Sequence, residues 1–330
     1  MNAAAAGPFP LINARILPGQ AENFVAGIDD ADTHAIAQAE LDYFRGKAEE
    51  ASRGVEPYLL SPDLALRVPA NLLCGYANLS LGRTATAHKC LKRLVDEASP
   101  DTSSGNILPA FGACMASTLL HLPAYRVDDL SAIFHYLPEG LRLYACYILA
   151  HRNYLNGDYQ QSLGIIRGAR AMASYPYVIS NVYLGIMESI DLVALKKIDE
   201  AKAAFMRTRE LALPDGFVEG FGEHHGILGG LVEACLKRDY PSDYKRVIDI
   251  TYRFSSGWRR LHGPIADEDV ADNLTTTEFS VAMLVKRGWT NNEVARLLGV
   301  SENTVKYHLS HVYEKLHINS RKELGQYMLR

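Results

Sequence analysis

The sequence predicts an all-α protein in two parts, a long domain of helical repeats followed by a small domain of four helices. Two observations support this prediction. Apolar residues recur with helical spacing in almost every segment before residue 265, and the alternation typical of strands is hard to find. After residue 274, four helix starts follow within about 50 residues, each with a capping signature. We expect residues 31–254 to form the repeat domain and residues 274–330 the C-terminal domain.

The beginning of the chain, residues 1–30, is expected to be a flexible arm. It starts with an alanine- and proline-rich stretch that lacks the basic region of a secretory signal. No apolar run in the chain reaches the roughly 18 residues that a membrane span needs. The five cysteines are scattered without a C-x-x-C pair, which favours buried thiols over a zinc site or a disulfide framework. We therefore expect a cytoplasmic protein with no membrane contact, no bound metal and no cofactor.

Three segments of the N-terminal part resemble one another. Each has a polar turn and then a helical pattern with a small residue three positions after its start. The starts are Thr84, Tyr159 and Ile198, and the small residues are Ala87, Ser162 and Ala201. The starts lie 75 and 39 residues apart, close to two periods and one period of about 38. Units of this kind bury their apolar faces by stacking on their neighbours.

This pattern resembles the tetratricopeptide repeat superfamily, at a period somewhat longer than the usual 34 residues. The resemblance covers residues 60–240 and implies a helical domain that senses a ligand or docks a protein. An irregular helical bundle is the alternative, and it is also all-α. Seven tyrosines fall between positions 144 and 183. We expect them to pack between helices, and the alternative is that they line a groove for a peptide or small ligand.

Residues 255–273 interrupt the helical pattern and are expected to form a linker. They contain Gly257, Gly263 and Pro264, followed by an acidic run. The charge balance changes beyond them. Residues 274–330 hold eight basic and five acidic side chains, whereas the rest of the chain holds 26 basic and 33 acidic ones. A positive C-terminal part is expected if only that part meets phosphate.

Helix starts in the C-terminal domain are marked by capping residues. In a capping box, a hydroxyl and a carboxylate three positions later satisfy amides that the helix leaves free. The boxes are Thr275 with Glu278, Thr290 with Glu293, and Ser320 with Glu323, and Ser301 is a single cap. These caps predict four helices, the last of which opens at Ser320.

The second and third of these helices are spaced as in a helix-turn-helix. Gly299 is expected to end the second helix in the left-handed conformation, and the third helix is expected to run from Glu302 to about Leu316. Its apolar residues form one stripe that faces the core: Val305, Leu309, Val312 and Leu316. The opposite face is polar and rich in hydrogen-bond donors, and a DNA major groove admits a helix of this kind.

These residues resemble the LuxR-type helix-turn-helix, also called the NarL/FixJ type. The resemblance rests on three blocks, one for each of the first three helices, and an arginine beyond them. The matching residues are Leu274, Thr275, Glu278, Gly288, Thr290, Asn291, Glu293, Val294, Ala295, Leu298, Val300, Ser301, Thr304, Val305, Lys306, His308, Val312, Lys315, Leu316 and Arg321. The resemblance implies a domain that binds duplex DNA as a homodimer.

The resemblance also implies a role for individual residues. Base edges are expected to be read by Asn303, Lys306, Tyr307 and Ser310. Backbone phosphates are expected to be held by Thr290, Asn292, Ser301, Thr304 and Lys315. The dimerisation surface is expected to include Leu324, Tyr327 and Met328.

Two positions depart from the family pattern. Thr277 stands where the family usually has arginine, and Asn292 stands where it usually has lysine or arginine. Both departures remove positive charge. We therefore expect DNA binding to depend on dimerisation or on a second protein.

Catalytic motifs are missing from the sequence, which contains no G-x-x-x-x-G-K-[ST], G-x-S-x-G or H-E-x-x-H pattern. His224 and His225 are adjacent, and neighbouring residues of a helix point to different sides, so a shared metal site is not expected. The sequence thus predicts a DNA-binding transcriptional regulator without catalytic residues rather than an enzyme. The alternative is a helical-repeat interaction scaffold with weak or accessory DNA binding.

Overall fold

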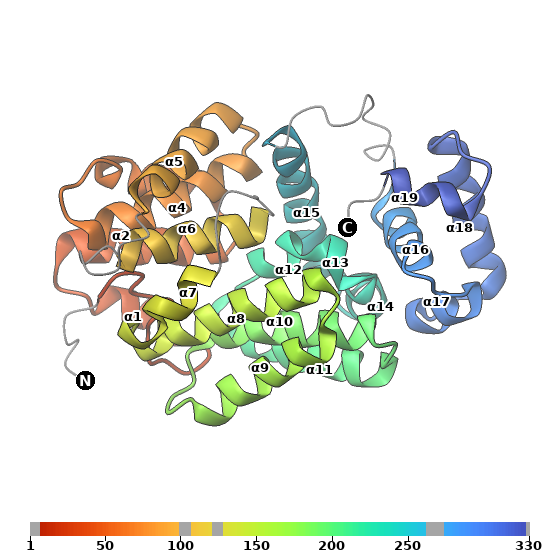
Figure 1. Cartoon of the computed structure of the whole chain (residues 1–330), viewed down its shortest axis with the longest axis horizontal. Coiled ribbons are helices and arrows are strands. Elements are labelled where there is room, and N and C mark those ends of the chain that lie inside the picture. Colours follow the sequence, from red (N-terminus) through yellow and green to blue (C-terminus); the bar gives the residue numbers. More distant parts are fainter. Residues whose placement is uncertain (1–6, 99–106, 121–127, 262–273, 328–330) are drawn as a thin grey trace.

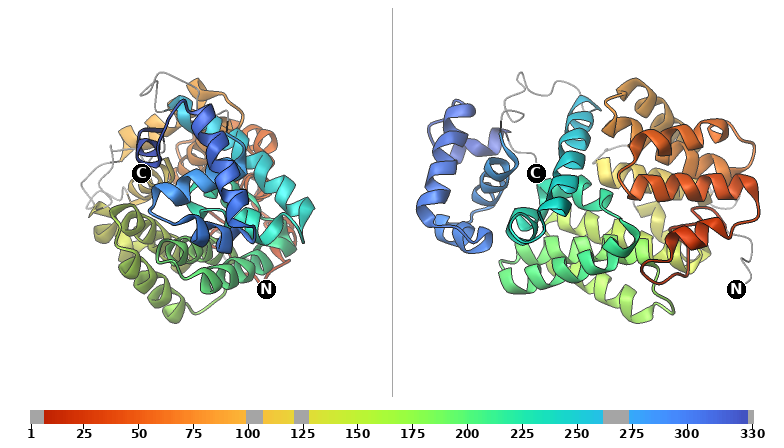
Figure 2. Two further views of the ribbon diagram at one scale, coloured as in Figure 1. Left: turned by 90° about the vertical axis from the view of Figure 1, so that its right-hand side faces the viewer. Right: turned by 180° about the vertical axis from the view of Figure 1, so that it is seen from behind.

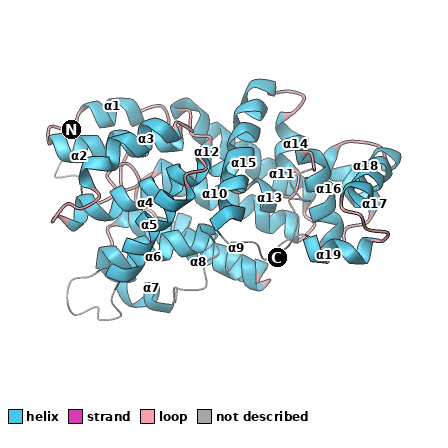
Figure 3. Cartoon of the chain, turned by 90° about the horizontal axis from the view of Figure 1, so that it is seen from above, coloured by secondary structure: helices cyan, strands magenta, loops and turns pink. Residues whose placement is uncertain are grey.

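The computed structural model describes residues 7–98, 107–120, 128–261 and 274–327, and every regular element among them is a helix. Figure 1 shows a large array of helices, residues 7–261, with a smaller group, residues 274–327, at one end. We refer to these two groups as the repeat domain and the C-terminal domain. Figure 3 shows helices and loops throughout the described part of the chain. The predicted all-α fold is confirmed.

Pairs of consecutive helices build most of the repeat domain. Four pairs share the same short connection: α2 (Ala31–Phe44) with α3 (Ala48–Val55), α4 (Leu64–Ser80) with α5 (Thr84–Glu97), α8 (Glu139–Asn156) with α9 (Tyr159–Met172), and α10 (Val178–Ala194) with α11 (Ile198–Ala212). Between the second and third of these pairs lie α6 (Ile107–Leu120) and α7 (Asp128–Ile133). Figure 2 shows these helices from behind, stacked along the long axis of the molecule.

The connection within a pair has one backbone conformation in all four cases. It contains a left-handed residue with φ between 59° and 87°, which is Gly46, Gly82, Gly157 or Lys196. The amide of the following residue donates to a carbonyl five positions back, at 2.8–2.9 Å. This geometry satisfies an otherwise free carbonyl at the end of the first helix and reverses the chain.

A small residue lies fully buried in the first turn of each second helix. The predicted starts Thr84, Tyr159 and Ile198 are the first residues of α5, α9 and α11. The small residues are Ala87, Ser162 and Ala201, and Ala51 is their equivalent in α3, which the sequence comparison missed. A small side chain here lets the two helices of a pair approach closely. The repeating helix pairs are thus observed, and their membership of the tetratricopeptide class stays a prediction.

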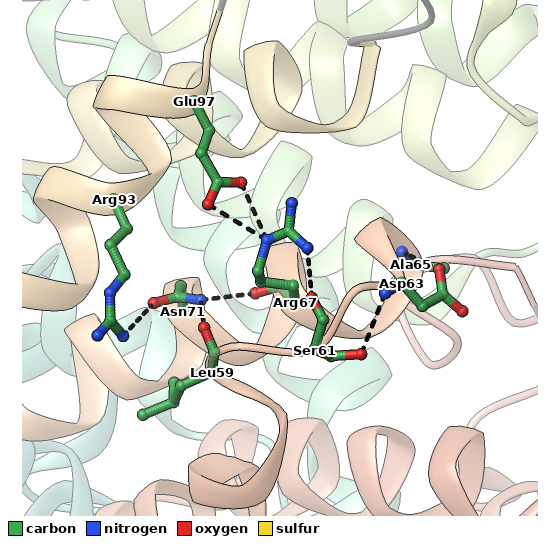
Figure 4. A network of polar contacts seen from close by, with 8 residues as sticks. All are labelled: Leu59, Ser61, Asp63, Ala65, Arg67, Asn71, Arg93 and Glu97. Atoms are coloured by element: carbon green, nitrogen blue, oxygen red, sulfur yellow. Dashed lines mark hydrogen bonds and ion pairs between the residues drawn. The ribbon is translucent and has the colours of Figure 1, made fainter.

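A polar network joins α4, α5 and the loop before them (Figure 4). Arg67 donates to the Glu97 carboxylate at 3.1 and 3.2 Å and also to the carbonyl of Ser61. Asn71 donates to the carbonyls of Leu59 and Arg67, both at 2.9 Å. The loop follows the short helix η1 (Glu56–Tyr58), so these bonds tie it to both helices of the pair.

The N-terminal segment is packed rather than loose, which corrects the expected flexible arm over residues 7–30. Phe9 and Leu11 are each 1% exposed, and α1 (Ala21–Ala26) is helical. The amide of Leu11 donates to the buried Glu40 carboxylate at 2.7 Å, and Asp215 accepts from the amides of Gly19 and Ala21. These partners are distant in the sequence, so local composition did not indicate the packing. Residues 1–6 lie outside the described part.

The expected linker is shorter than residues 255–273, because α15 (Pro241–Leu261) continues through its first third. Gly257, interpreted as a helix breaker, lies inside α15 where the helix touches α4. A Cβ atom at this position would lie 2.0 Å from the carbonyl oxygen of Leu79. Glycine is therefore required there for close packing and not for flexibility. Residues 262–273 lie outside the described part.

Short helices complete the repeat domain: η3 (Phe134–Tyr136), η4 (Leu213–Asp215), α12 (Glu219–Glu223), α13 (His225–Leu228) and α14 (Leu231–Leu236). The last two face the C-terminal domain. Within the described ranges, no helix combines the length and the apolar character that crossing a membrane requires.

Candidate nucleic-acid interface

Three helices of the C-terminal domain begin at the predicted caps. They are α16 (Thr276–Lys286), α17 (Asn291–Leu298) and α18 (Glu302–Lys315). Both predicted boxes before α16 and α17 are formed, with hydroxyl and carboxylate each bonded to the backbone. The Ser301 hydroxyl accepts from the amide of Thr304 at 3.1 Å. Each helix start is thus fixed by its own side chain, at about 0.5–2 kcal/mol per cap.

The turn between α17 and α18 has the predicted form. Gly299 is left-handed, with φ 69°, and the amide of Val300 donates to the carbonyl of Ala295 at 3.1 Å. Only Gly299, Val300 and Ser301 separate the two helices. The pair is therefore a helix-turn-helix, and α18 occupies the position of its second helix.

The predicted apolar stripe of α18 is confirmed. Val305, Val312 and Leu316 are fully buried, and Leu309 is 7% exposed. Trp289, which precedes α17, is 1% exposed and belongs to the same core. This packing fixes how α18 is turned about its own axis. The polar residues on the opposite face of α18 therefore point to solvent.

The four predicted base-reading residues lie on the exposed face of α18. Asn303, Lys306, Tyr307 and Ser310 are all exposed, and their spacing of three, four and seven positions aligns them on one face. Tyr307 is 58% exposed. The Lys306 ammonium lies 3.3 Å from the Glu302 carboxylate one turn earlier. This ion pair is open to solvent, so it leaves Lys306 available to another partner.

The predicted phosphate-binding residues have different surroundings. The hydroxyls of Thr290, Ser301 and Thr304 already take part in helix capping. Asn292 is exposed at the start of α17. Lys315 is an ion-pair partner, with its Nζ 2.7 Å from Glu278 Oε2.

That ion pair determines the state of Glu278. Burial opposes its ionisation, but the hydrogen bonds from Lys315 and from the amide of Thr275 together lower its pKa. The Glu278 carboxylate therefore serves both the cap of α16 and the contact with α18. Because Lys315 is paired with this carboxylate, its attraction for a DNA phosphate is weaker than that of an unpaired lysine.

The end of the domain differs from prediction in two respects. The capping box of Ser320 and Glu323 is not formed. The Ser320 hydroxyl donates to the Glu323 carboxylate and does not accept a backbone amide of the helix. A 3-10 turn, η6 (Arg321–Glu323), and the short α19 (Leu324–Tyr327) follow. Leu324 is fully buried in its own domain, which corrects its assignment to a dimerisation surface. The Tyr327 side chain and Met328 lie outside the described residues.

Arg321 has a structural role that the sequence did not reveal. Its guanidinium donates to the carbonyl of Val285 at 3.1 Å and to the carbonyl of Trp289. It thereby closes the end of α16 and the turn before α17. The same guanidinium also borders a shallow hollow beside Lys306, Ser310 and Asn291.

The C-terminal domain rests on the repeat domain through α16 and α17. Substantial helix contacts join α13 to α16 and α14 to α17. Gly230 is left-handed, and a Cβ atom there would lie 2.8 Å from the Leu298 side chain. Arg287, which follows α16, donates to the carbonyl of Ile227 at 3.3 Å. Figures 1 and 2 show α18 on the side of the domain that faces away from the repeat domain.

The predicted tyrosine-rich region mostly forms the interior of the repeat domain. Five of the seven are buried: Tyr144, Tyr147, Tyr154, Tyr177 and Tyr183. The Tyr147 hydroxyl is 2.9 Å from His224 Nε2, and His225 Nε2 is 2.8 Å from Glu233. The two adjacent histidines thus have separate partners. The packing interpretation of these five tyrosines is confirmed.

The sequence of the C-terminal domain matches a known family. The model described as "Bacterial regulatory proteins, luxR family" matches residues 272–328. The probable transcriptional regulatory protein SgaR of Hyphomicrobium methylovorum is 39% identical over 57 residues, which are 17% of this chain and 27% of SgaR. The putative HTH-type transcriptional regulator Rv0890c of Mycobacterium tuberculosis is 48% identical over 52 residues, 16% of this chain and 6% of that protein.

Some relatives are similar over more than this domain. The HTH-type transcriptional regulator MalT of Vibrio parahaemolyticus is 26% identical over 198 residues, 53% of this chain and 21% of MalT. That share of the chain is larger than the C-terminal domain, so it includes part of the repeat domain. The chain spans about a quarter or less of the length of these relatives. No solved structure gives a significant match. The C-terminal domain of this chain is a helix-turn-helix domain of the LuxR family of bacterial regulatory proteins.

Proposed function

We propose that this protein is a sequence-specific, DNA-binding transcriptional regulator that acts in the cytoplasm. The observation that carries the proposal is the position of α18. It follows the turn of a LuxR-family helix-turn-helix, buries its apolar stripe and leaves Asn303, Lys306, Tyr307 and Ser310 on a face that the repeat domain does not cover. A helix with such a face fits a major groove.

Base reading is assigned to the exposed face of α18. Lys306 is the residue able to donate to the acceptor atoms of guanine, and Asn303 to an adenine. Tyr307 offers a ring to a thymine methyl and a hydroxyl to phosphate. Contacts of this type contribute about 1–3 kcal/mol of discrimination each.

Phosphate binding is assigned to both sides of α18. Thr290 and Asn292 lie at the start of α17, Ser301 and Thr304 at the start of α18, and Lys315 at its end. These contacts supply affinity that is independent of sequence and weakens with salt. Binding as a homodimer on two half-sites completes the proposal, with Tyr327 and Met328 as the remaining candidates for that contact.

The repeat domain is proposed to receive the signal, as a small molecule or as a docked protein. A hollow between α9, α10 and α11 supports the first option. It is lined by Arg170, Asn181, Glu188, Arg207 and Thr208, which offer charged and polar groups to a small polar effector. The contact between the domains gives such a signal a route to α16 and α17.

Fluorescence anisotropy with the full-length chain and genomic DNA fragments tests the proposal. We expect binding at about 50 mM salt that weakens steeply toward about 200 mM, and selection of particular fragments over bulk DNA. Absence of salt-dependent binding at about 50 mM would sink the regulator proposal. Binding without selection among fragments would favour an interaction scaffold with accessory DNA binding.

A further inference from the structure

Two lysines of the repeat domain lie at its boundary with the C-terminal domain, beside the starts of α16 and α17. One is Lys237, which follows α14, and the other is Lys196, in the turn between α10 and α11. Each reaches the first turn of a helix in the C-terminal domain. The neighbouring residues there, Thr277 and Asn292, carry no charge. At both helix starts the cation therefore comes from the repeat domain.

Lys237 lies beside the start of α16. Its ammonium is 3.4 Å from the Thr277 hydroxyl and 5.9 Å from the centre of the Tyr244 ring. Lys237 is exposed, and no carboxylate of the described residues lies within ion-pair distance of it. Burial lowers the pKa of His308 in α18; the Glu278 carboxylate opposes this effect, and the positive charge of Lys237 adds to it. Lys237 is thus an available cation beside the first turn of α16.

Lys196 lies beside the start of α17. Its ammonium is 2.8 and 3.0 Å from the two carboxylate oxygens of Glu293 and 5.7 Å from the centre of the Trp289 ring. Its side chain stays 42% exposed. The hydrogen bond from Lys196 and that from the amide of Thr290 lower the pKa of Glu293 to about 2. Without Lys196, an ionised carboxylate would stand uncompensated next to Asn292.

The backbone at Lys196 supports a specific role for its side chain. In the three equivalent turns the left-handed residue is glycine, whereas Lys196 adopts φ 59° with a full side chain. A left-handed conformation is unfavourable for a residue with a Cβ atom, and glycine would adopt it without cost. Lysine stands instead in the turn whose side chain bonds to Glu293 of the C-terminal domain.

We propose that the repeat domain forms part of the DNA-binding surface, with Lys196 and Lys237 placed to meet the phosphate backbone on the two sides of α18. This inference rests on the proposed function, since it extends the surface on which α18 would read DNA. Lys237 supplies a cation directly. Lys196 neutralises Glu293, which would otherwise repel phosphate, and presents its exposed ammonium at the same edge.

Domain docking is the competing role for Lys196. A second ion pair crosses the domains nearby, between Arg296 of α17 and Asp199 of α11, at 3.4 Å. If the ion pair of Lys196 and Glu293 only held the domains together, removing either partner would change DNA binding in the same direction. A phosphate-facing lysine gives the opposite result for the two partners, because removal of Glu293 leaves more positive charge at the edge.

The experiment compares Lys→Gln variants of the full-length chain on a fluorescein-labelled duplex of mixed sequence, about three helical turns long, across salt concentrations. We expect Lys237→Gln and Lys196→Gln each to weaken binding about threefold or more and to reduce the slope of log K against log salt by about one. Lys92→Gln is the matched control. Lys92 is an exposed lysine of α5, remote from α18 and paired with Asp96 at 2.7 Å, so its loss should leave affinity and slope unchanged.

Glu293→Gln separates the two roles of Lys196. Glutamine keeps the capping box at the start of α17, so the helix is retained while the charge is lost. We expect this variant to bind about twofold to fivefold tighter than the wild type, with a steeper salt slope. The double variant Lys196→Gln with Glu293→Gln should return to near the wild-type affinity.

The outcomes distinguish this inference from the proposed function. If the wild type binds but both lysine variants keep its slope, only the extended surface is overturned. If Glu293→Gln weakens binding as much as Lys196→Gln, the pair serves docking and the assignment of Lys196 is overturned. If the wild type shows no binding at about 50 mM salt, the proposed function and this extension fall together.

Discussion

The starts of α16, α17 and α18 differ from those of the second helices of the repeat pairs, although the first helices α2 and α4 are capped by Asp30 and Asp63. In the C-terminal domain, Thr275, Thr290 and Ser301 each accept a backbone amide with a side-chain oxygen. In the repeat domain, the second helix of all four pairs begins without any side-chain cap. It begins after a left-handed residue and is held by burial of a small residue against its partner helix.

The difference follows from size. The C-terminal domain has few helices and a small core, so caps of about 1 kcal/mol each are a large part of its stability. The repeat domain continues its core from one helix pair to the next, and packing there outweighs any single cap. Substitutions should therefore act through close packing in the repeat domain and through polar groups in the C-terminal domain. The predictions below test this contrast.

Gly257→Ala should have the largest effect. The new methyl group would lie 2.0 Å from the carbonyl oxygen of Leu79, so α15 and α4 have to separate. We expect a loss of about 3 kcal/mol in the free energy of unfolding, measured by urea denaturation with far-UV circular dichroism. Gly164→Ala is the control, since Gly164 of α9 has no neighbour within 4 Å and alanine is the better helix former. Equal stability of the two variants would contradict the role of packing.

Glu40→Gln should change the pH dependence of stability. Burial raises the pKa of Glu40 to about 8, despite hydrogen bonds from the amides of Leu11 and Ile12. A carboxyl group whose pKa is raised on folding contributes stability that is fully present below its ordinary pKa, 4.5, and that is lost as the pH rises through about 8.

Glutamine stays neutral and still accepts a hydrogen bond from Leu11, so the loss between pH 5 and pH 9 should shrink by about 4 kcal/mol. Urea midpoints at these two pH values check this. Some decline should remain, because burial also raises the pKa values of Glu223 and Asp191 to about 7. An unchanged decline would show that Glu40 is already ionised in the folded protein.

Lys306→Ala should weaken specific DNA binding by more than about 1 kcal/mol, the value of a base contact, while leaving non-specific binding almost intact. Lys315→Ala should instead weaken all sequences alike. Anisotropy titrations with a selected fragment and a scrambled one give both quantities. If Lys306→Ala lowered both affinities equally, the exposed face of α18 would not be the reading face.

How far the sequence could predict the molecule depends on the range of the interactions involved. The caps at Thr275, Thr290 and Ser301 and the turn at Gly299 were predictable because each is decided within four residues. The stripe from Val305 to Leu316 was predictable from helical spacing alone. The first repeat was also within reach, because Gly46 and Ala51 stand in the same relation as Gly82 and Ala87.

The features that were missed depend on partners far away in the chain. Leu11 is buried and its amide donates to Glu40, and Gly257 is required because Leu79 passes close to it. The contacts of Lys196 and Lys237 with the C-terminal domain are of the same kind. Nothing near these residues in the sequence marks them, since a lysine beside a turn is usually only a solvated charge.

Thr275→Ala should have the smallest effect and gives the most direct test of the contrast. The Thr275 hydroxyl accepts the amide of Glu278 at 3.3 Å, and its loss should lower stability by about 1 kcal/mol, because the Glu278 half of the box persists. Arg83→Ala is the equivalent change at the uncapped start of α5, where only an exposed ion pair with Glu49 is lost, worth less than about 0.5 kcal/mol. Hydrogen exchange of the α16 and α5 amides reports each helix separately. Protection should fall about fivefold in α16 and barely in α5, and the reverse order would contradict the contrast between the two kinds of helix start.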